Sequence, residues 1–411
     1  MPSQEVKLVT DRKRVYVIGG GAAGFFGAIA AAQRGHQVTI LEAAAQVLAK
    51  VRISGGGRCN VTHHCFDPRE LVKHYPRGAK QLRGPFSKFQ PSDTIEWFAE
   101  RGVRTKVEPD GRMFPTTDDS ATIVDCLKNA ASESQVRVLT RTNVVDIDAS
   151  PDGFLLTTQT GQTIDAERLL LATGGGKAGL KLASKLGHNI IDPVPSLFTF
   201  NMQDPRLEGL QGIAVESVRC KLVVETKSFE QAGPLLITHW GMSGPAVLKL
   251  SAVAARELHN TNYQAALSVN WLAPSNTTEV QQALTKFKAN NGKKNTDSVS
   301  PFPLPKRLWQ SLVKHIGAEN VRWADLSKTL ANQLATELTS GSFSVSGKGV
   351  FKEEFVTCGG IDLNEVDFRS MESRVSPGLF FAGEILDVDG LTGGFNFQNA
   401  WTTSWIAGNS I

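Results

Sequence analysis

The stretch RVYVIGGGAAGFFGAIAAAQRGHQVTILE, residues 14–42, decides the fold of this chain. Its β-branched start, residues 15–18, predicts a buried strand that breaks into the glycine turn GGGAAG at 19–24. A helix is predicted next, and a second strand at 37–41 ends in Glu42. Strand, glycine turn, helix, strand and acid in this order are typical of a βαβ unit that binds a dinucleotide.

The three glycines of this G-x-G-x-x-G pattern have separate tasks. Gly19 allows the tight turn, Gly21 lets the backbone approach a pyrophosphate, and Gly24 lets the helix pack on the strand. Glu42, eighteen residues after Gly24, is placed to accept hydrogen bonds from both ribose hydroxyls of an adenosine. Since an acid here disfavours a 2′-phosphate, the pattern favours FAD or NAD over NADP.

The composition sets bounds on the domain count and on the compartment. With 411 residues, the chain is expected to form two or three domains. Its 41% apolar and 20% charged residues are typical of a soluble globular protein. The first thirteen residues lack the apolar core of a signal peptide, so a cytoplasmic address and no membrane partner are expected. The five cysteines are odd in number and widely spaced, which predicts no disulfide framework.

Residues 50–60, KVRISGGGRCN, are too rich in glycine for the interior of a helix or strand. We expect a loop laid against a ligand here. Nine Lys or Arg residues occur between 50 and 88, against only Asp67 and Glu70. We interpret these cations as a solvated face near an anionic cofactor, and RNA binding is the alternative.

A second glycine pattern follows a predicted β-meander at 136–172. The stretch GGGKAG at 174–179 again matches G-x-G-x-x-G. The next acid, Asp192, lies beside prolines, which is poor context for a second βαβ unit. We therefore favour a strand end that passes close to the first cofactor over a second dinucleotide site.

The pattern of elements changes near Ser196. Before this point, helices are predicted at 93–101, with Asp93 and Glu96 as a capping pair, and at about 120–131. After it, strands are predicted at 197–202, 214–226 and 264–271. Helices are then predicted at 278–289, 306–316 and 325–338, with a linker at 290–305. We expect an α/β, Rossmann-like domain at 1–195 and 346–411. An insert at 196–345 would interrupt it, with a β-rich lobe at about 196–272 and a helical lobe at about 273–345.

The C-terminal stretch GLFFAGEILDVDGLTGGFNFQNAW, residues 378–401, distinguishes FAD from NAD. A predicted strand at 379–381 delivers Gly383 and Glu384, whose carboxylate can accept hydrogen bonds from a ribityl chain. Gly393–Asn396 opens a helix, with close backbone approach expected at Gly394. Its N-terminus can stabilise the negative charge that develops at the N1/C2=O edge of a reduced isoalloxazine. Nicotinamide offers neither group, so FAD, bound non-covalently, fits better.

Four blocks of sequence together resemble a known family: SGGGRCN (54–60), THWGMSGP (238–245), TCGG (357–360), and GE (383–384) followed by DVDGLTGGFN (387–396). This set looks like the signatures of the bacterial FAD-binding flavoproteins called the aminoacetone oxidase or BaiN-like family. The resemblance implies a two-dinucleotide-binding-type flavoprotein domain interrupted by an insert with a β-barrel and a small helical lobe. The family has a longer loop after the A-T-G-G strand end than residues 174–180 provide here. Substrate and NAD(P)H dependence therefore stay open.

The expected function is a cytoplasmic FAD-dependent oxidoreductase that acts on an unidentified small organic substrate, with NAD(P)H as a candidate electron donor. A flavoprotein that binds or modifies RNA is one alternative. A non-catalytic FAD-bound redox sensor or scaffold is the other. The sequence leaves the substrate, the electron donor and acceptor, and the oligomeric state open.

The candidate cofactor-binding residues share a place in the glycine motifs or at predicted strand ends: Gly19, Gly21, Ala22, Ala23, Gly24, Glu42, Ser54, Gly57, Arg58, Cys59, Asn60, Val144, Thr173, Gly174, Gly383, Glu384, Asp389, Gly393, Gly394, Phe395 and Asn396. No metal site is expected, because Cys59, His63, His64 and Cys65 lack a usual finger spacing. Covalent flavin attachment through His63 or His64 is chemically feasible and has no specific support.

The candidate catalytic residues are Cys59, His239 and Trp240. Cys59 is either a redox partner of the flavin or a packing residue, and we favour packing because no C-x-x-C resolving thiol is present. His239, Trp240 and Met242 lie on a glycine-flanked turn before a helix that Pro245 can start. They either line the substrate pocket or anchor the insert.

Overall fold

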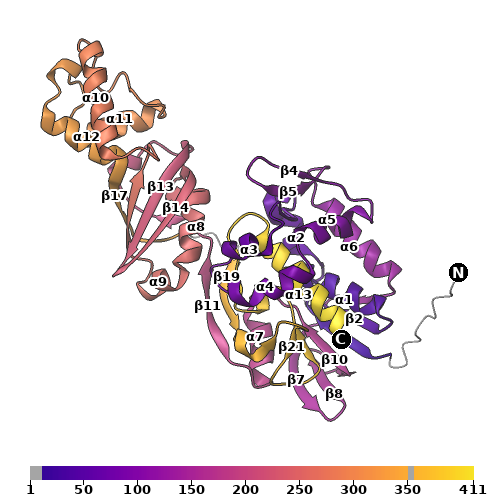
Figure 1. The fold of residues 1–411 in the computed structure, drawn as a ribbon. Coiled ribbons are helices and arrows are strands. Elements are labelled where there is room, and N and C mark those ends of the chain that lie inside the picture. Colours follow the sequence, from indigo (N-terminus) through magenta and orange to yellow (C-terminus); the bar gives the residue numbers. More distant parts are fainter. Residues whose placement is uncertain (1–11, 350–355) are drawn as a thin grey trace. The chain divides into compact units, whose positions relative to one another are not determined.

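The computed structural model describes residues 12–349 and 356–411, and it divides into two compact units (Figure 1). Unit 1 consists of Met1–Pro193 and Val356–Ile411, and unit 2 of Val194–Phe355. The second unit is therefore inserted in the sequence of the first. Each unit is described by itself.

Unit 1 is built on a seven-stranded sheet. Its strands, in spatial order, are β20 (Val366–Asp367), β21 (Glu372–Ser373), β22 (Leu379–Phe381), β10 (Arg168–Leu171), β1 (Arg14–Ile18), β2 (Gln37–Leu41) and β6 (Arg137–Leu139). The strands from β22 to β6 run parallel, while β20 and β21 are antiparallel additions. Val15 and Val17 of β1 are fully buried. The βαβ unit predicted from residues 14–42 is confirmed.

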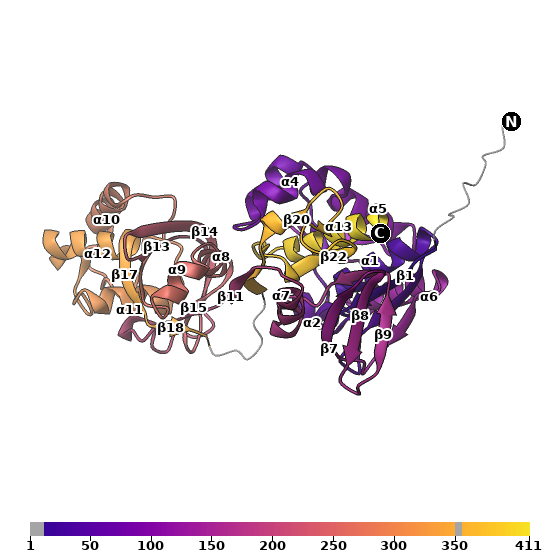
Figure 2. The ribbon, with the colours of Figure 1, turned by 90° about the horizontal axis from the view of Figure 1, so that it is seen from below.

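Two layers cover this sheet. Helix α1 (Ala22–Gln33) packs along α13 (Phe395–Ser410), and both also contact strands of the sheet. The meander of β7 (Val144–Ser150), β8 (Gly153–Thr158) and β9 (Thr163–Ala166) contacts β1 and β10 and lies on the other side of the sheet (Figure 2). The predicted meander is thus confirmed for its central part, whereas its first and last strands, β6 and β10, join the main sheet.

Shorter elements complete unit 1. They are α2 (Ala49–Gly57), β3 (Thr62–His63), α3 (Pro68–Leu71), η1 (Val72–His74), α4 (Ala79–Lys88), α5 (Pro91–Ala99), β4 (Thr105–Val107), β5 (Arg112–Pro115), α6 (Ala121–Glu133), α7 (Lys177–Lys185), β19 (Val356–Ile361), η4 (Leu363–Glu365) and η5 (Gly383–Ile385). Strand β11 (Ile190–Ser196) begins in unit 1 and continues into unit 2, which starts at Val194. Helix α5 begins two residues earlier than predicted. Its Asp93 carboxylate accepts the Gln90 N–H at 2.7 Å, so the predicted pairing of Asp93 with Glu96 is wrong. In α6, Ile123, Val124, Leu127, Ala130 and Ala131 are buried and form one face.

Unit 2 contains a second seven-stranded sheet, which is antiparallel. Its spatial order is β17 (Gly341–Val345), β16 (Ala265–Asn270), β13 (Ala214–Val224), β14 (Lys227–Ile237), β15 (Gly241–Ser243), β12 (Phe200–Asn201) and β18 (Gly347–Lys348). In β13, Val218, Cys220, Leu222 and Val224 are buried and alternate with exposed residues, so one face of the sheet belongs to the core. The sequence did not predict β14, in which Gly233-Pro234 interrupts the alternation.

Helices pack with this sheet in unit 2: η2 (Pro205–Leu207), α8 (Pro245–Val253), α9 (Ala255–Asn260), α10 (Thr277–Asn291), α11 (Lys306–His315), η3 (Trp323–Asp325) and α12 (Lys328–Ser340). The start of α8 at Pro245 is confirmed. The stretch 290–305 is more than a linker, because Thr296 is fully buried and its carbonyl accepts a hydrogen bond from Trp309 Nε1 at 2.7 Å.

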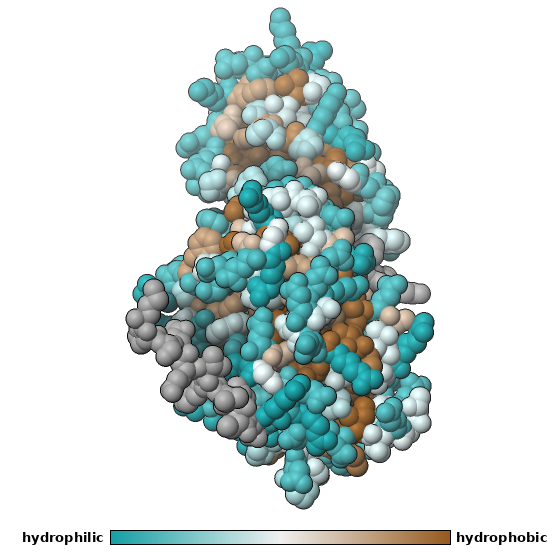
Figure 3. All heavy atoms as spheres, turned by 90° about the vertical axis from the view of Figure 1, so that its right-hand side faces the viewer, coloured by the Kyte–Doolittle hydropathy of each residue, from teal (hydrophilic) through white to brown (hydrophobic). Residues whose placement is uncertain are grey.

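The surface is mostly polar. Hydrophilic side chains cover much of the face drawn in Figure 3, with apolar residues between them. None of the helices that the structure describes combines the length and the apolar character that a membrane span requires.

Candidate functional site

The turn between β1 and α1 explains each glycine of the first motif. A Cβ on Gly24 would lie 1.8 Å from the Gly19 carbonyl oxygen, so only glycine lets α1 pack here. Gly19 has a φ of +109°, and a Cβ there would lie 2.5 Å from the Ala172 carbonyl oxygen after β10. A Cβ on Gly21, in contrast, would have no atom of the described residues within 4 Å. The middle glycine thus opens onto free space, where a pyrophosphate can approach.

The start of α1 suits an anion. Among the described residues, no side chain caps α1, and its first turn, which begins with Ala22 and Ala23, carries no acid. Its first backbone N–H groups, together with the helix dipole, favour a negatively charged ligand. This start and the open space at Gly21 therefore fit the pyrophosphate of FAD.

Glu42 lies at the end of β2 and reaches back over the same turn. Its Oε2 accepts the Gly20 N–H at 2.6 Å, and its Oε1 accepts the Ala44 N–H at 2.7 Å. These two donors fix the carboxylate and leave further lone pairs on both oxygens. Glu42 can therefore brace the turn and accept ribose hydroxyls at the same time.

The glycine-rich segment after β2 is only partly the loop that the sequence predicted. Residues 49–53 form the first turn of α2, and the chain then leaves helical geometry at Ser54, Gly55 and Gly56. Gly56 and Gly57 have positive φ, and a Cβ on either would meet no atom of the described residues within 4 Å. The prediction is wrong for 50–53, whose apolar Val51 is buried as in an ordinary helix.

Cys59 is a packing residue in this structure. Its side chain is fully buried, and burial raises the pKa of its thiol to about 12, although a hydrogen bond with Ser54 lowers it somewhat. The thiolate is the form that attacks and donates electrons, and it would be negligible at neutral pH. The structure therefore argues against Cys59 as a redox partner.

We expect Cys59 to resist alkylation in the native protein. After brief treatment with iodoacetamide at pH 8, peptide mass spectrometry should find label on the half-buried Cys65 and none on Cys59 until urea is added. Cys65→Ser should remove the fast label. Native labelling of Cys59 as fast as that of Cys65 would contradict its placement.

Asn60 connects this segment to the start of α13. With its amide oriented to suit its neighbours, Asn60 Oδ1 accepts the Gly394 N–H at 2.9 Å and its amide nitrogen donates to the Thr62 carbonyl at 3.0 Å. A Cβ on Gly394 would lie 2.5 Å from the same Thr62 oxygen. We expected glycine here for approach to a flavin, but contact with β3 already requires it.

Aromatic rings hold the first residue of α13. The Phe395 ring contacts the rings of His63 and His74, with centroids 4.5 and 4.2 Å away. His63 Nδ1 is 2.9 Å from the Gly393 carbonyl oxygen, and the Tyr75 hydroxyl donates to the Phe395 carbonyl at 2.6 Å. His63 is therefore used to position the loop before α13.

Two predicted cofactor-binding side chains are engaged within the chain. Both carboxylate oxygens of the fully buried Asp389 accept hydrogen bonds from the Arg77 guanidinium. The Asn396 side chain accepts the Gly390 N–H at 2.7 Å and donates to the Gly390 carbonyl at 2.9 Å. These contacts correct the prediction: Asp389 and Asn396 shape the loop at 387–396, and their side chains are not free to hold a ligand.

Glu384 remains at the site. Its Oε2 lies 3.1 Å from Lys50 Nζ. A Cβ on Gly174 would lie 3.7 Å from the same Oε2. The Gly383 N–H donates to Thr403 Oγ1 at 2.9 Å. The structure thus brings together the ends of β10 and β22 and adds Lys50, which the sequence did not single out as a partner of Glu384.

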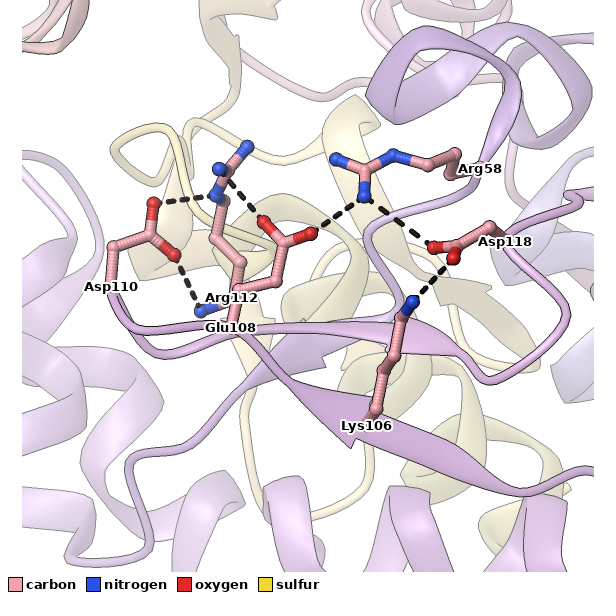
Figure 4. Close-up of polar contacts among 6 residues, drawn as sticks. All are labelled: Arg58, Lys106, Glu108, Asp110, Arg112 and Asp118. Carbon is pink, nitrogen blue, oxygen red and sulfur yellow. Dashed lines mark hydrogen bonds and ion pairs between the residues drawn. The ribbon is translucent and has the colours of Figure 1, made fainter.

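Arg58 is held by the hairpin of β4 and β5 (Figure 4). One of its terminal nitrogens lies 2.6 Å from Glu108 and 3.5 Å from Asp118, and the guanidinium carbon is 4.0 Å from the centre of the Phe114 ring. The hydrogen bond from Lys106 lowers the pKa of Asp118, which keeps the carboxylate charged. This network balances the charge of Arg58 within the chain, and a role of Arg58 in cofactor binding stays a prediction.

The structure places neither Val144 nor Thr173 in a polar network like that of Arg58, as far as the described residues show. Val144 begins β7 and is buried. Thr173 follows β10, and its hydroxyl donates to the Gly174 carbonyl at 3.4 Å. Their place near a cofactor stays a prediction.

The candidate residues of the insert lie in unit 2, at the turn from β14 to β15. His239 and Trp240 are exposed, Trp240 by 57%, whereas Met242 is fully buried. The Thr238 N–H donates to the Gly241 carbonyl at 2.8 Å, which closes the turn. Met242 therefore belongs to the core of unit 2, which agrees with the alternative that it anchors the insert.

The basic segment at 50–88 carries fewer free charges than its sequence suggests. Five of its nine cations lie within 4 Å of an acid: Lys50, Arg58, Arg69, Lys73 and Arg77. Intramolecular pairing accounts for much of this segment, which weakens the argument for RNA binding that the cation count alone supplied.

Comparisons with known proteins identify the family of this chain. A family model described as "HI0933-like protein Rossmann domain" matches residues 13–410. The chain is 31% identical over 412 residues to the "ribosomal RNA dihydrouridine synthase" of Escherichia coli K12, with 98% of each chain covered. It is 28% identical over 417 residues to the "3-dehydro-bile acid delta(4,6)-reductase" of Clostridium scindens, with 97% of this chain and 98% of the relative covered.

The fold is shared with flavoenzymes of known structure. A 3-ketosteroid-Δ4-(5α)-dehydrogenase from Rhodococcus jostii RHA1 aligns with a TM-score of 0.51 at 15% identity and covers 98% of both chains. A flavocytochrome c3 fumarate reductase aligns with a TM-score of 0.50 at 17% identity over 98% of this chain and 78% of the other. These likenesses concern the fold alone. The family match over residues 13–410 shows that the chain belongs to the HI0933-like family of FAD-dependent Rossmann-type oxidoreductases, which confirms the resemblance to the aminoacetone oxidase or BaiN-like family.

Proposed function

We propose that this protein is an FAD-dependent reductase of a carbon–carbon double bond conjugated to a carbonyl group. The observation that supports a bound flavin is the open space at Gly21, beside the uncapped start of α1 and the carboxylate of Glu42. The reaction class comes from the two named relatives. Making dihydrouridine saturates a ring double bond of uridine, and the other relative is named as a reductase of Δ4,6 double bonds. Both double bonds are conjugated to a carbonyl.

The residues on this chain would bind and orient the cofactor. Gly21 and the start of α1 would hold the pyrophosphate, Glu42 the adenosine ribose, and Glu384 with Lys50 the ribityl segment. Asn60 fixes Gly394, which sets where the N-terminus of α13 begins. Bound FAD supplies the hydride-transfer chemistry, and the chain supplies position and electrostatics.

The reaction class can be tested with the reduced holoprotein. After anaerobic reduction by dithionite, cyclohex-2-enone should reoxidise the flavin, which is read at its absorption maximum. Cyclohexene, which has the same ring without the carbonyl, should not. If neither compound nor any RNA reoxidises the flavin faster than buffer, a non-catalytic scaffold becomes the better account.

RNA is the second candidate substrate, because the full-length relative at 31% identity is named for modifying ribosomal RNA. We place a small molecule first, since much of the basic segment at 50–88 is paired within the chain. Unmodified ribosomal RNA and free uridine, offered to the same reduced protein, separate the two. Reoxidation by RNA alone, accompanied by dihydrouridine in the product, would favour the second candidate.

We propose that the insert, a β-barrel with a helical lobe, selects the substrate through the exposed turn of His239 and Trp240. An exposed tryptophan on a rigid turn offers a large apolar face at small entropic cost. Trp240→Ala should keep the FAD content and lower kcat/KM by about tenfold, which corresponds to ~1.4 kcal/mol. Val223→Ala, which also trims an exposed side chain of the same sheet, is the matched control. Equal kinetics for the two variants would count against the turn.

A further inference from the structure

An open groove of about 450 Å³ follows one side of α7 in unit 1. Leu180, Ile190 and Pro193 give it an apolar wall, and lysines at 177, 181 and 185 line it as well. The lysines are four residues apart, so they rise along one side of the helix at about 6 Å intervals. No function assigned above uses this groove.

The charge in the groove is concentrated toward the start of α7. Lys185 Nζ is 2.7 Å from Asp146 and 2.8 Å from Asp148, so its charge is met within the chain. Lys177 and Lys181 are exposed and make no ion pair with any residue in the ranges 12–349 and 356–411. The charge of Lys181 also acts on Asp146 and contributes to the lowered pKa of the Asp146 carboxyl group. Two cations are thus left available beside an apolar wall.

This combination fits a nucleotide phosphate. A flat base can lie on the apolar wall while the phosphate meets Lys177 and Lys181. None of the lining residues is acidic, so a 2′-phosphate would meet no lining carboxylate. The volume lies within the range of small-ligand sites, and α7 begins without a side-chain cap among the described residues.

The groove begins close to the region assigned to the flavin. Lys177 is three residues after Gly174, whose Cβ position is 3.7 Å from Glu384 Oε2. A nucleotide held there by its phosphate would be anchored on the segment that also faces Glu384. A flavin-dependent reductase requires an electron donor, and a nucleotide bound at this place can be that donor.

We infer that the α7 groove binds the phosphorylated adenosine end of NADPH, with Lys177 and Lys181 as the phosphate ligands. This inference rests on the proposed reductase function. In the donor step NADPH loses a hydride and becomes NADP⁺, and the flavin takes up that hydride with one proton from solvent. Glu42, in contrast, belongs to the FAD site, where an acid excludes a 2′-phosphate.

Charge reversal of Lys181 tests the groove. Calorimetric titration of NADP⁺ into FAD-loaded protein should show Lys181→Glu weakening binding by about tenfold or more. Lys128→Glu makes the same charge change at an exposed position in the middle of α6 and should stay within about twofold of the parent. NAD⁺ should bind the parent more weakly than NADP⁺. If Lys181→Glu fails to fold, Lys181→Gln replaces it.

Two results would overturn the inference. One is equal NADP⁺ affinity for the Lys181 and Lys128 variants. The other is a Lys181-dependent loss of RNA oligonucleotide binding without any loss of NADP⁺ binding. The proposed function is tested separately. If Lys181 controls NADP⁺ binding but no conjugated alkene reoxidises the dithionite-reduced flavin, the nucleotide site in the α7 groove is supported and the proposed reaction class is wrong.

Discussion

Gly24→Ala should destabilise unit 1 by more than ~3 kcal/mol and yield protein without FAD, because the added methyl would lie 1.8 Å from the Gly19 carbonyl oxygen. Overpacking usually costs about 1–3 kcal/mol, and here the obstacle is backbone between β1 and α1, which cannot rotate away. Urea unfolding followed by circular dichroism, with FAD measured after acid release, gives both quantities.

Gly21→Ala is the matched control, three residues earlier in the same turn. Its φ of −89° is accessible to alanine, and the methyl would meet no described atom within 4 Å. The apoprotein should therefore unfold at nearly the parent urea concentration, while FAD binds more weakly because the methyl occupies the space meant for the pyrophosphate. If both variants unfold alike, the different tasks assigned to these glycines are wrong.

The sequence predicted the βαβ unit because its signals are local. The strand at 37–41 matches β2 and the strand at 379–381 matches β22, since each is a short apolar run bounded by turn residues. The start of α8 at Pro245 follows from one residue's fixed φ. None of these predictions required knowledge of what packs against the element.

The partners of charged side chains could not be predicted in this way. Arg58 pairs with Glu108 fifty positions away, and Arg77 pairs with Asp389 across 312 positions. A glycine motif shows where a ligand can approach, but a charged side chain in the same motif can equally be satisfied by another part of the chain. Arg58, Asp389 and Asn396 were therefore assigned to the cofactor on position alone.

The candidate site thus separates into two kinds of residue. Gly21, Gly56 and Gly57 face space that a side chain could fill, and these are the positions where a ligand has room. Gly394, Asp389 and Asn396 are tied to β3, to Arg77 and to Gly390, and they set the shape of the loop before α13. Both kinds lie in the same motifs, but only Gly21, whose φ of −89° suits alanine, should lose FAD without losing stability when substituted, because the positive φ of Gly56 and Gly57 strains any side chain there.

The second kind can be tested at Asp389, where we expect a loss of stability first and of FAD binding as its consequence. Asp389→Asn removes the negative charge that faces the guanidinium of Arg77, whose side chain is only 16% exposed, although Asp387 still acts on the guanidinium charge. Removing one member of a buried ion pair costs about 3–5 kcal/mol, and the slight exposure of Arg77 puts the expected loss near ~3 kcal/mol.

The control for Asp389 is Glu70→Gln, which makes the same isosteric change in an exposed pair. Glu70 and Lys73 lie 2.7 Å apart with more than half of each side chain exposed, so the loss should stay below about 1 kcal/mol. Urea unfolding of both variants, with and without added FAD, measures the difference. If Asp389 instead binds the cofactor, Asp389→Asn will match the parent as apoprotein and differ only when FAD is added. Because the Arg77 guanidinium loses the carboxylate of Asp389 whether or not FAD is present, we expect the loss of stability in both measurements.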